Sequence, residues 1–114
     1  MFMITIELVG NKSKFKPYEV IRGNLCWSFG EKDKAFRYID VNLGWIASND
    51  RAEDAMCHAH ERFRIKTKSG SSSFEVMLPC APCSYKGELF CVNWFLEASS
   101  PNKQYVTSVS ICVE

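Results

Sequence analysis

The sequence predicts an all-β protein, an antiparallel β-sandwich of immunoglobulin type with about seven strands. Apolar residues recur with a period of two rather than the helical period of about 3.6, and turn-forming clusters interrupt the chain at short intervals. At 114 residues the chain has the size of one ordinary domain, so we treat residues 1–114 as a single sandwich. The composition, 46% hydrophobic and 24% charged, is typical of a soluble globular protein.

The first three expected strands cover residues 2–9, 19–29 and 36–47, and each alternates apolar with polar side chains. Such alternation is typical of strands with one face on a core. Their predicted inward residues are Phe2, Ile4, Ile6 and Leu8; Ile21, Leu25, Trp27 and Phe29; and Ile39, Val41, Leu43 and Trp45.

The remaining four expected strands cover residues 59–68, 73–79, 88–98 and 104–113, with the run Ser69–Ser73 as a hairpin turn. Lettered A to G in chain order, the seven strands would form sheets ABED and CFG. The segment 48–59 is expected to be either one helical turn or a polar loop. The predicted inward residues are Ala59, Phe63 and Ile65; Phe74, Val76 and Leu78; Phe90, Val92, Trp94 and Leu96; and Tyr105, Val109, Ile111 and Val113.

Two stretches carry a family resemblance, "FKPYEVIRGNLCW" near the start and "FEVMLPCAPCSYKGELFCVNWFLEA" later. The first places Gly23 after a turn and the second contains an F-x-V-x-L-P segment followed by a P-x-S-Y-x-G corner. Together they resemble the arrestin-like family, including its sporulation-control-type and retromer-subunit-type relatives. The resemblance implies a sandwich in which Tyr85 buries its ring at a corner between sheets, as a tyrosine corner does. It also implies a scaffold or adaptor role.

Six cysteines permit two interpretations of the sulfur. If residues 59–68 and 73–79 formed a hairpin, Cys57 and His58 or His60 would come near Cys80 and Cys83, a possible tetrahedral zinc site. The alternative is ordinary thiols, which suits a reducing compartment. No helix is expected after Cys83, so a thioredoxin-like redox motif is not predicted. An immunoglobulin-type disulfide between Cys26 and Cys91 is expected to be absent, because both alternate away from the predicted core.

A stripe of basic and imidazole side chains lies on one face of the fourth expected strand, formed by His58, His60, Arg62, Arg64 and Lys66. It could bind an acidic peptide, a phosphate or a headgroup. The alternative interpretation is the ordinary polar face of an antiparallel sheet.

The functional prediction is a non-catalytic adaptor that binds a protein partner through loops or through an exposed edge such as 2–9 or 104–113. Self-pairing of an edge into a homodimer is a related expectation. No nucleophile elbow, P-loop or dinucleotide fingerprint is present, and Asp50, Glu53 and Asp54 are expected in a solvated loop, so an enzyme is not predicted.

Net charge of +1 gives no footprint for nucleic acid, and no stretch approaches the length of a membrane span. The absence of a signal-peptide pattern at the start leads us to expect a cytoplasmic protein.

Overall fold

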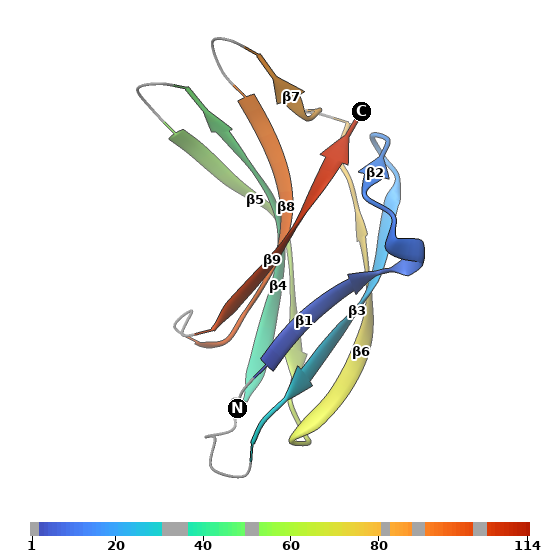
Figure 1. Cartoon of the computed structure of the whole chain (residues 1–114), viewed down its shortest axis with the longest axis vertical. Helices are drawn as coiled ribbons and strands as arrows, with labels where there is room; N and C mark the ends of the chain where they lie inside the picture. Colours follow the sequence, from blue (N-terminus) through green and yellow to red (C-terminus); the bar gives the residue numbers. More distant parts are fainter. Residues whose placement is uncertain (1–2, 31–36, 50–52, 81–82, 88–90, 102–104) are drawn as a thin grey trace.

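The fold is a sandwich of two β-sheets, seen in a computed structural model that describes residues 3–30, 37–49, 53–80, 83–87, 91–101 and 105–114 (Figure 1). The molecule is elongated, 48 × 31 × 19 Å, with the start of β1 and the end of β9 toward opposite ends of the long axis. Within the described ranges the elements are β1 (Met3–Leu8), the short 3-10 turn η1 (Val9–Asn11), β2 (Lys14–Phe15), β3 (Val20–Ser28), β4 (Tyr38–Ser48), β5 (Glu53–Arg64), β6 (Ser69–Met77), β7 (Tyr85–Lys86), β8 (Cys91–Ser99) and β9 (Val106–Val113).

The smaller sheet has the strand order β1-β3-β6, and the larger has the order β2-β9-β8-β4-β5 with β7 paired to β8. All pairs are antiparallel except β2–β9, which is parallel. All seven expected strands are present, so the predicted all-β class and antiparallel sandwich are confirmed. In the part of the chain that the structure describes, no helix is long and apolar enough to cross a membrane.

One strand lies in a different sheet from the one predicted. The fourth long strand, β5, pairs with β4 in the larger sheet and not with β6, so the ABED arrangement is wrong. Because β5 already begins at Glu53, four residues separate it from β4, and this short connection closes an antiparallel hairpin. Residues Glu53 to Ala59 are strand, so neither the helical turn nor the polar loop is found there, while 50–52 lie outside the described residues.

The serine run belongs to a strand and not to a turn. Ser69 pairs with Ser28 and Gly70 with Trp27 at the start of β6. A Cβ atom on Gly70 would lie 2.9 Å from the Trp27 ring, so small side chains here leave room for that indole. The run therefore accommodates a core tryptophan on the neighbouring strand.

The core lies between the sheets and contains most of the side chains that alternation assigned to it. Trp27 and Trp94 are buried, and Trp45 is half-buried against the same cluster. Tyr105 was predicted to point inward, but it is 40% exposed because β9 begins one residue later. Phe2 and Phe90 lie outside the described residues. The buried apolar set is Ile4, Ile6, Phe15, Ile21, Leu25, Trp27, Phe29, Ile39, Val41, Leu43, Phe74, Leu78, Val92, Trp94, Leu96, Ala98, Ile111 and Val113.

Candidate functional site

The outer side of β9 is the main open edge of the larger sheet. Strand β8 pairs with β9 on one side, whereas β2 covers the other side only at Cys112 and Val113. The backbone N–H groups of Cys112 and Glu114 donate to the Ser13 and Phe15 carbonyls, at 2.8 and 2.9 Å. Since N–H direction alternates along a strand, Ser108 and Ser110 also point their N–H groups to that side, where no described strand pairs with them.

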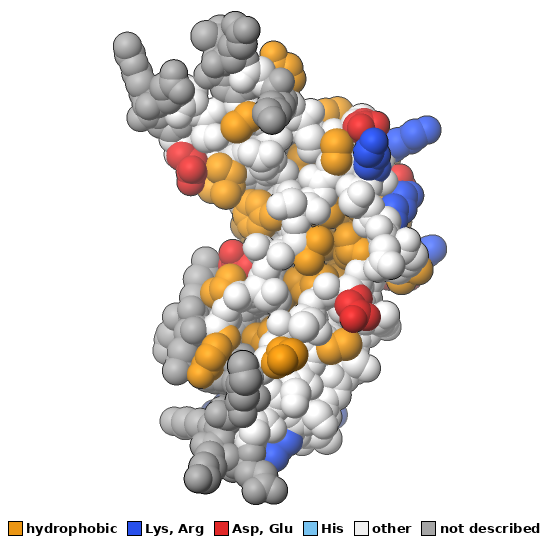
Figure 2. Space-filling model, in the orientation of Figure 1, with side chains coloured by type: hydrophobic (Ala, Val, Ile, Leu, Met, Phe, Trp, Pro, Cys, Tyr) orange, Lys and Arg blue, Asp and Glu red, His pale blue; other side chains and the backbone are white. Residues whose placement is uncertain are grey.

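The composition of this edge favours pairing with another strand. Val106–Val113 carries no charged residue, no proline and no glycine, and Val106 is 50% exposed. Charged residues and prolines are the usual means by which proteins discourage contact between edges. In Figure 2, hydrophobic side chains gather along the middle of the face on which β9 and β1 lie in front, and Lys and Arg side chains lie at its margins.

The first expected edge, residues 2–9, corresponds to β1, which is an edge of the smaller sheet. Met3 on β1 is 53% exposed, and Glu7 places one charge on this strand. Both predicted edges are therefore edges in the structure. The sequence analysis did not name β5 as a binding edge, although the predicted ABED order would also have placed that strand at the end of a sheet.

Strand β5 is interrupted by a β-bulge that divides the predicted basic stripe. Leu43 pairs with Ala59 but Gly44 pairs with Cys57, so His58 is an extra residue opposite β4. The His58 ring lies edge-on to the buried Trp94, with 6.4 Å between ring centroids. The expectation that His58 shares a face with the other four residues is therefore wrong, and it failed because a bulge resets the alternation on which the expectation rested.

After the bulge, the next two residues of the stripe, His60 and Arg62, both contact the carboxylate of Asp40. Asp40 Oδ1 lies 2.9 Å from His60 Nε2 and accepts a hydrogen bond of 2.8 Å from Arg62 Nε. Burial alone raises the pKa of Asp40, but the hydrogen bonds from Arg62 and His60 outweigh it and leave that pKa below its ordinary value. The same carboxylate raises the pKa of Arg62 through their hydrogen bond. Arg62 also stacks on the Tyr38 ring, 3.8 Å from its centroid.

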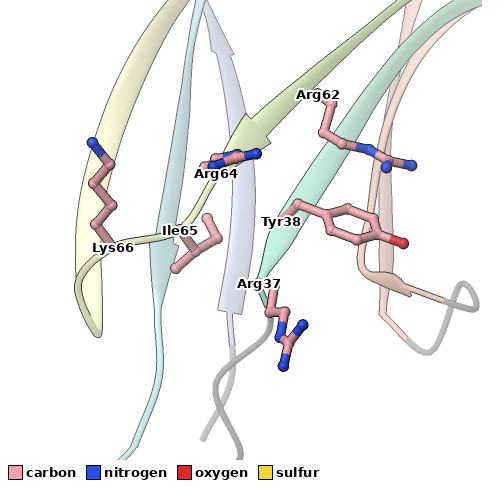
Figure 3. A pocket seen from close by; sticks show the side chains of 6 residues that line it. All are labelled: Arg37, Tyr38, Arg62, Arg64, Ile65 and Lys66. Atoms are coloured by element: carbon pink, nitrogen blue, oxygen red, sulfur yellow. The ribbon is translucent and has the colours of Figure 1, made fainter.

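The last two residues of the stripe, Arg64 and Lys66, open onto a groove of about 500 Å³ at the start of β4. Figure 3 shows Arg37 just before β4, Tyr38 at the start of β4, Arg62 and Arg64 at the end of β5, and Ile65 and Lys66 in the connection to β6. Arg37 lies beside Arg64 and Lys66 in this groove although it is distant from both in the sequence. A stripe analysis confined to one strand could not find it.

The predicted zinc ligands are not brought together by the predicted hairpin, because β5 and β6 lie in different sheets. Cys57 Sγ contacts Asn42 Oδ1 at 3.6 Å on the outer face of the larger sheet. Cys80 lies beside Tyr18 instead, and their side-chain hydrogen bond raises the pKa of Tyr18. Throughout the described ranges, no three His, Cys, Asp or Glu side chains form a group that could hold a metal ion. All six cysteines are free thiols.

Ser84 connects the corner at residues 83–87 to the end of β9 through two hydrogen bonds with Val113. Ser84 N–H donates to the Val113 carbonyl at 2.7 Å, and Ser84 Oγ accepts from Val113 N–H at 2.8 Å. Tyr85 is 50% exposed, so the expected burial of its ring is wrong; the ring packs over Gly87, where a Cβ would lie 2.5 Å away. The other glycine of the resemblance, Gly23, lies under Phe74 of β6, and a Cβ there would approach that ring to 2.7 Å.

Comparison with known proteins finds no matching family model and no matching curated protein. Among solved structures, the sporulation control protein Spo0M from Bacillus subtilis matches with a TM-score of 0.70 and 18% identity, over 99% of this chain and 49% of that chain. A superoxide reductase (neelaredoxin) from Ignicoccus hospitalis matches with a TM-score of 0.54 and 15% identity, over 98% of this chain and 80% of that one.

A β-glucosidase from Listeria innocua matches with a TM-score of 0.57 and 14% identity, over 99% of this chain and 16% of its own. At such low identities these matches establish a shared fold, an immunoglobulin-like sandwich of the kind found in Spo0M. The chain spans about half the length of the Spo0M chain it resembles.

Proposed function

We propose that this chain is an arrestin-type interaction module that binds a protein partner by accepting a strand along β9. The observation that carries the proposal is the outer side of β9 between Val106 and Ile111, where no described strand pairs with it and the sequence has no charge or proline. A partner strand there would pair with outward N–H and C=O groups, which gives affinity through the backbone. Neighbouring exposed apolar side chains such as Val106 and Met3 would add specificity.

The proposal includes a non-catalytic role in the cytoplasm. The likeness to Spo0M, a protein named for sporulation control, is compatible with a regulatory scaffold. Strand β9 itself carries serine, threonine and cysteine but no acidic or basic side chain. Because a sandwich hosts many functions, the edge itself and not the fold is the basis of the proposal.

The test removes one outward N–H group from β9 without changing its ladder to β8. Ser108→Pro deletes an N–H on the uncovered side, whereas the matched control Ser108→Ala deletes the same hydroxyl and keeps the N–H. Both variants and the unaltered protein would be used to capture partners from the native host. We expect one protein to be retained by the unaltered chain and by Ser108→Ala, and lost with Ser108→Pro. Equal retention by all three would rule out β9 as the binding edge.

Self-pairing is a special case in which the partner is a second copy of the chain. Sedimentation velocity over a range of concentrations would show it as a dimer that Ser108→Pro abolishes and Ser108→Ala preserves. The thermal transition of each variant would be recorded first, so that loss of binding is not confused with loss of fold.

A further inference from the structure

The groove at the end of the β4–β5 hairpin contains more positive charge than the described residues around it neutralise. Four cationic side chains line it, from Arg37, Arg62, Arg64 and Lys66, together with Tyr38 and Ile65. One of the four is paired with an acid: Arg62 donates a hydrogen bond of 2.8 Å to the Asp40 carboxylate. Within the described part of the chain, Arg37, Arg64 and Lys66 have no ion-pair partner.

The groove is held in shape by contacts that do not use those three cations. Ile65 N–H donates to the Arg37 carbonyl at 2.9 Å, which ties the β5–β6 connection to the start of β4. Arg62 is fixed between Asp40 and the Tyr38 ring. The backbone and one wall are therefore organised before any ligand arrives, which lowers the entropic cost of binding.

We propose that this groove binds a phosphate group, with Arg64, Lys66 and Arg37 as its ligands and Arg62 as a positioning residue. Guanidinium groups form paired hydrogen bonds with phosphate or carboxylate oxygens. A phosphate monoester carries about two negative charges at neutral pH, whereas a carboxylate carries one. The three cations have no acidic partner among the described residues, so the doubly charged phosphate is the better match for them. The volume of about 500 Å³ leaves space for a second phosphate or for the group that carries the first.

This site is separate from the edge proposed for partner binding. Strands β8 and β4 lie between β9 and β5 in the larger sheet, so a ligand in the groove does not occupy the uncovered side of β9. The two proposals can therefore fail independently. Phosphate binding should persist in Ser108→Pro, and measuring it checks that independence directly.

The phosphate group could belong to a soluble molecule or to a lipid, and the experiment has one arm for each source. In the first arm, inorganic pyrophosphate is titrated into isotopically labelled protein at low salt, and amide chemical shifts are followed. In the second arm, the protein is sedimented with phosphatidylcholine vesicles that contain or lack phosphatidic acid. Sodium chloride at matched ionic strength controls for unspecific screening.

The variant Arg64→Gln/Lys66→Gln removes two of the proposed ligands, and Lys14→Gln/Lys16→Gln is its control. Both changes remove two exposed cations, and the control pair lies on and beside β2, distant from the groove along the molecule (Figure 1). We expect pyrophosphate or phosphatidic acid vesicles to bind, with shifts centred on residues 37, 38 and 62–66. Affinity should fall by about tenfold or more in the groove variant, because each charged hydrogen bond is worth that much.

The two arms have distinct outcomes. Binding in the first arm alone identifies a soluble phosphate ligand, and binding only to vesicles with phosphatidic acid identifies a lipid headgroup. An equal loss of affinity in both double variants would show attraction by net charge alone and would overturn the proposal. So would the absence of binding in both arms.

Discussion

The β5 edge of the larger sheet and the part of β9 with which β2 does not pair differ in the charge of their side chains. Strand β5 has twelve residues, of which five are charged and two are histidines, whereas β9 has eight residues and no charge. Charged side chains on an edge strand discourage pairing with other chains. One edge of the same sheet is therefore protected by charge, whereas the other carries no charge that would discourage pairing.

The side chains of the two edges also have different surroundings. On β5, His60 and Arg62 hold Asp40 of the neighbouring strand, and Arg64 faces the groove. On β9, the residues that face solvent on the same side of the sheet are Ser108 and Ser110, which are small and neutral. The exposed groups of β5 are therefore mainly charged side chains, whereas those of β9 are backbone N–H and C=O groups with which no described strand pairs.

The largest expected effect comes from moving a proline by one residue along β9. Val109→Pro should destabilise the protein by about 1–3 kcal/mol more than Ser108→Pro, because the Val109 N–H points to β8 and its loss leaves a buried carbonyl unpaired. Val109 pairs with Leu96, which is fully buried. Urea unfolding of both variants, followed by tryptophan fluorescence, gives the comparison.

Comparing Val109→Pro with Ser108→Pro tests whether the outer side of β9 is open. If both variants lose the same stability, the Ser108 N–H is also part of a ladder, and β9 has a partner on its outer side. In that case the contrast between β5 and β9 would disappear.

A smaller effect is expected at the bulge of β5. A Cβ on Gly44 would lie 2.6 Å from the Met56 carbonyl and 3.2 Å from the Phe95 ring. Gly44→Ala should therefore cost about 1–3 kcal/mol, as overpacking usually does, because a backbone atom must move. Denaturant unfolding measures this loss, and Ser110→Ala on exposed β9 serves as a control that should change stability by less than about 0.5 kcal/mol. A neutral Gly44→Ala would show that the bulge is not tightly held.

The sequence was sufficient to predict the core and the existence of the long strands. Residues such as Ile39, Val41 and Leu43 alternate with polar neighbours, and alternation alone assigns one face to the interior. The same logic placed Trp27 and Trp94 in the core. Local periodicity thus carries the information about which side chains are buried.

The partner of β5 and the composition of the groove could not be predicted in this way. Strand pairing depends on the sheet to which the whole β4–β5 hairpin belongs, and periodicity does not encode it. The bulge at His58 adds a residue without any change in composition that would reveal it. Arg37 joins Arg64 and Lys66 only because β4 and β5 are antiparallel neighbours, so the groove depends on a pairing that the sequence analysis assigned wrongly.

Removing positive charge from β5 should increase the tendency of this edge to pair with another copy of the chain. In Arg62→Thr/Arg64→Thr, the formal net charge changes from +1 to −1, and Thr favours a strand. We expect more self-association than in Lys14→Thr/Lys16→Thr, which has the same net charge. Sedimentation velocity at matched concentrations would show dimers and larger species only in the β5 variant. Equal behaviour of the two variants would mean that side-chain charge does not protect β5.

The smallest expected effect is a pH dependence confined to the β5 edge. The hydrogen bonds of Arg62 and His60 hold the folded pKa of Asp40 below its ordinary value, which is about 3.9 in an unfolded chain. A carboxyl with a lowered folded pKa contributes stability that is fully present above the unfolded pKa and is lost as the pH falls through the folded one. The difference in unfolding free energy between the unaltered protein and Asp40→Asn should therefore shrink as the pH falls below about 4.

Unfolding by urea from about pH 5 downward measures this difference, and Ser108→Ala provides the reference from the other edge, since serine does not titrate in this range. We expect the Asp40→Asn difference to be well below the effect of Val109→Pro, because its partners His60 and Arg62 are about half exposed and solvent weakens such pairs. A difference that stayed constant through the acid range would mean that Asp40 is not held by these cations in solution. The organised wall of the groove would then be lost, whereas the open edge of β9 would be unaffected.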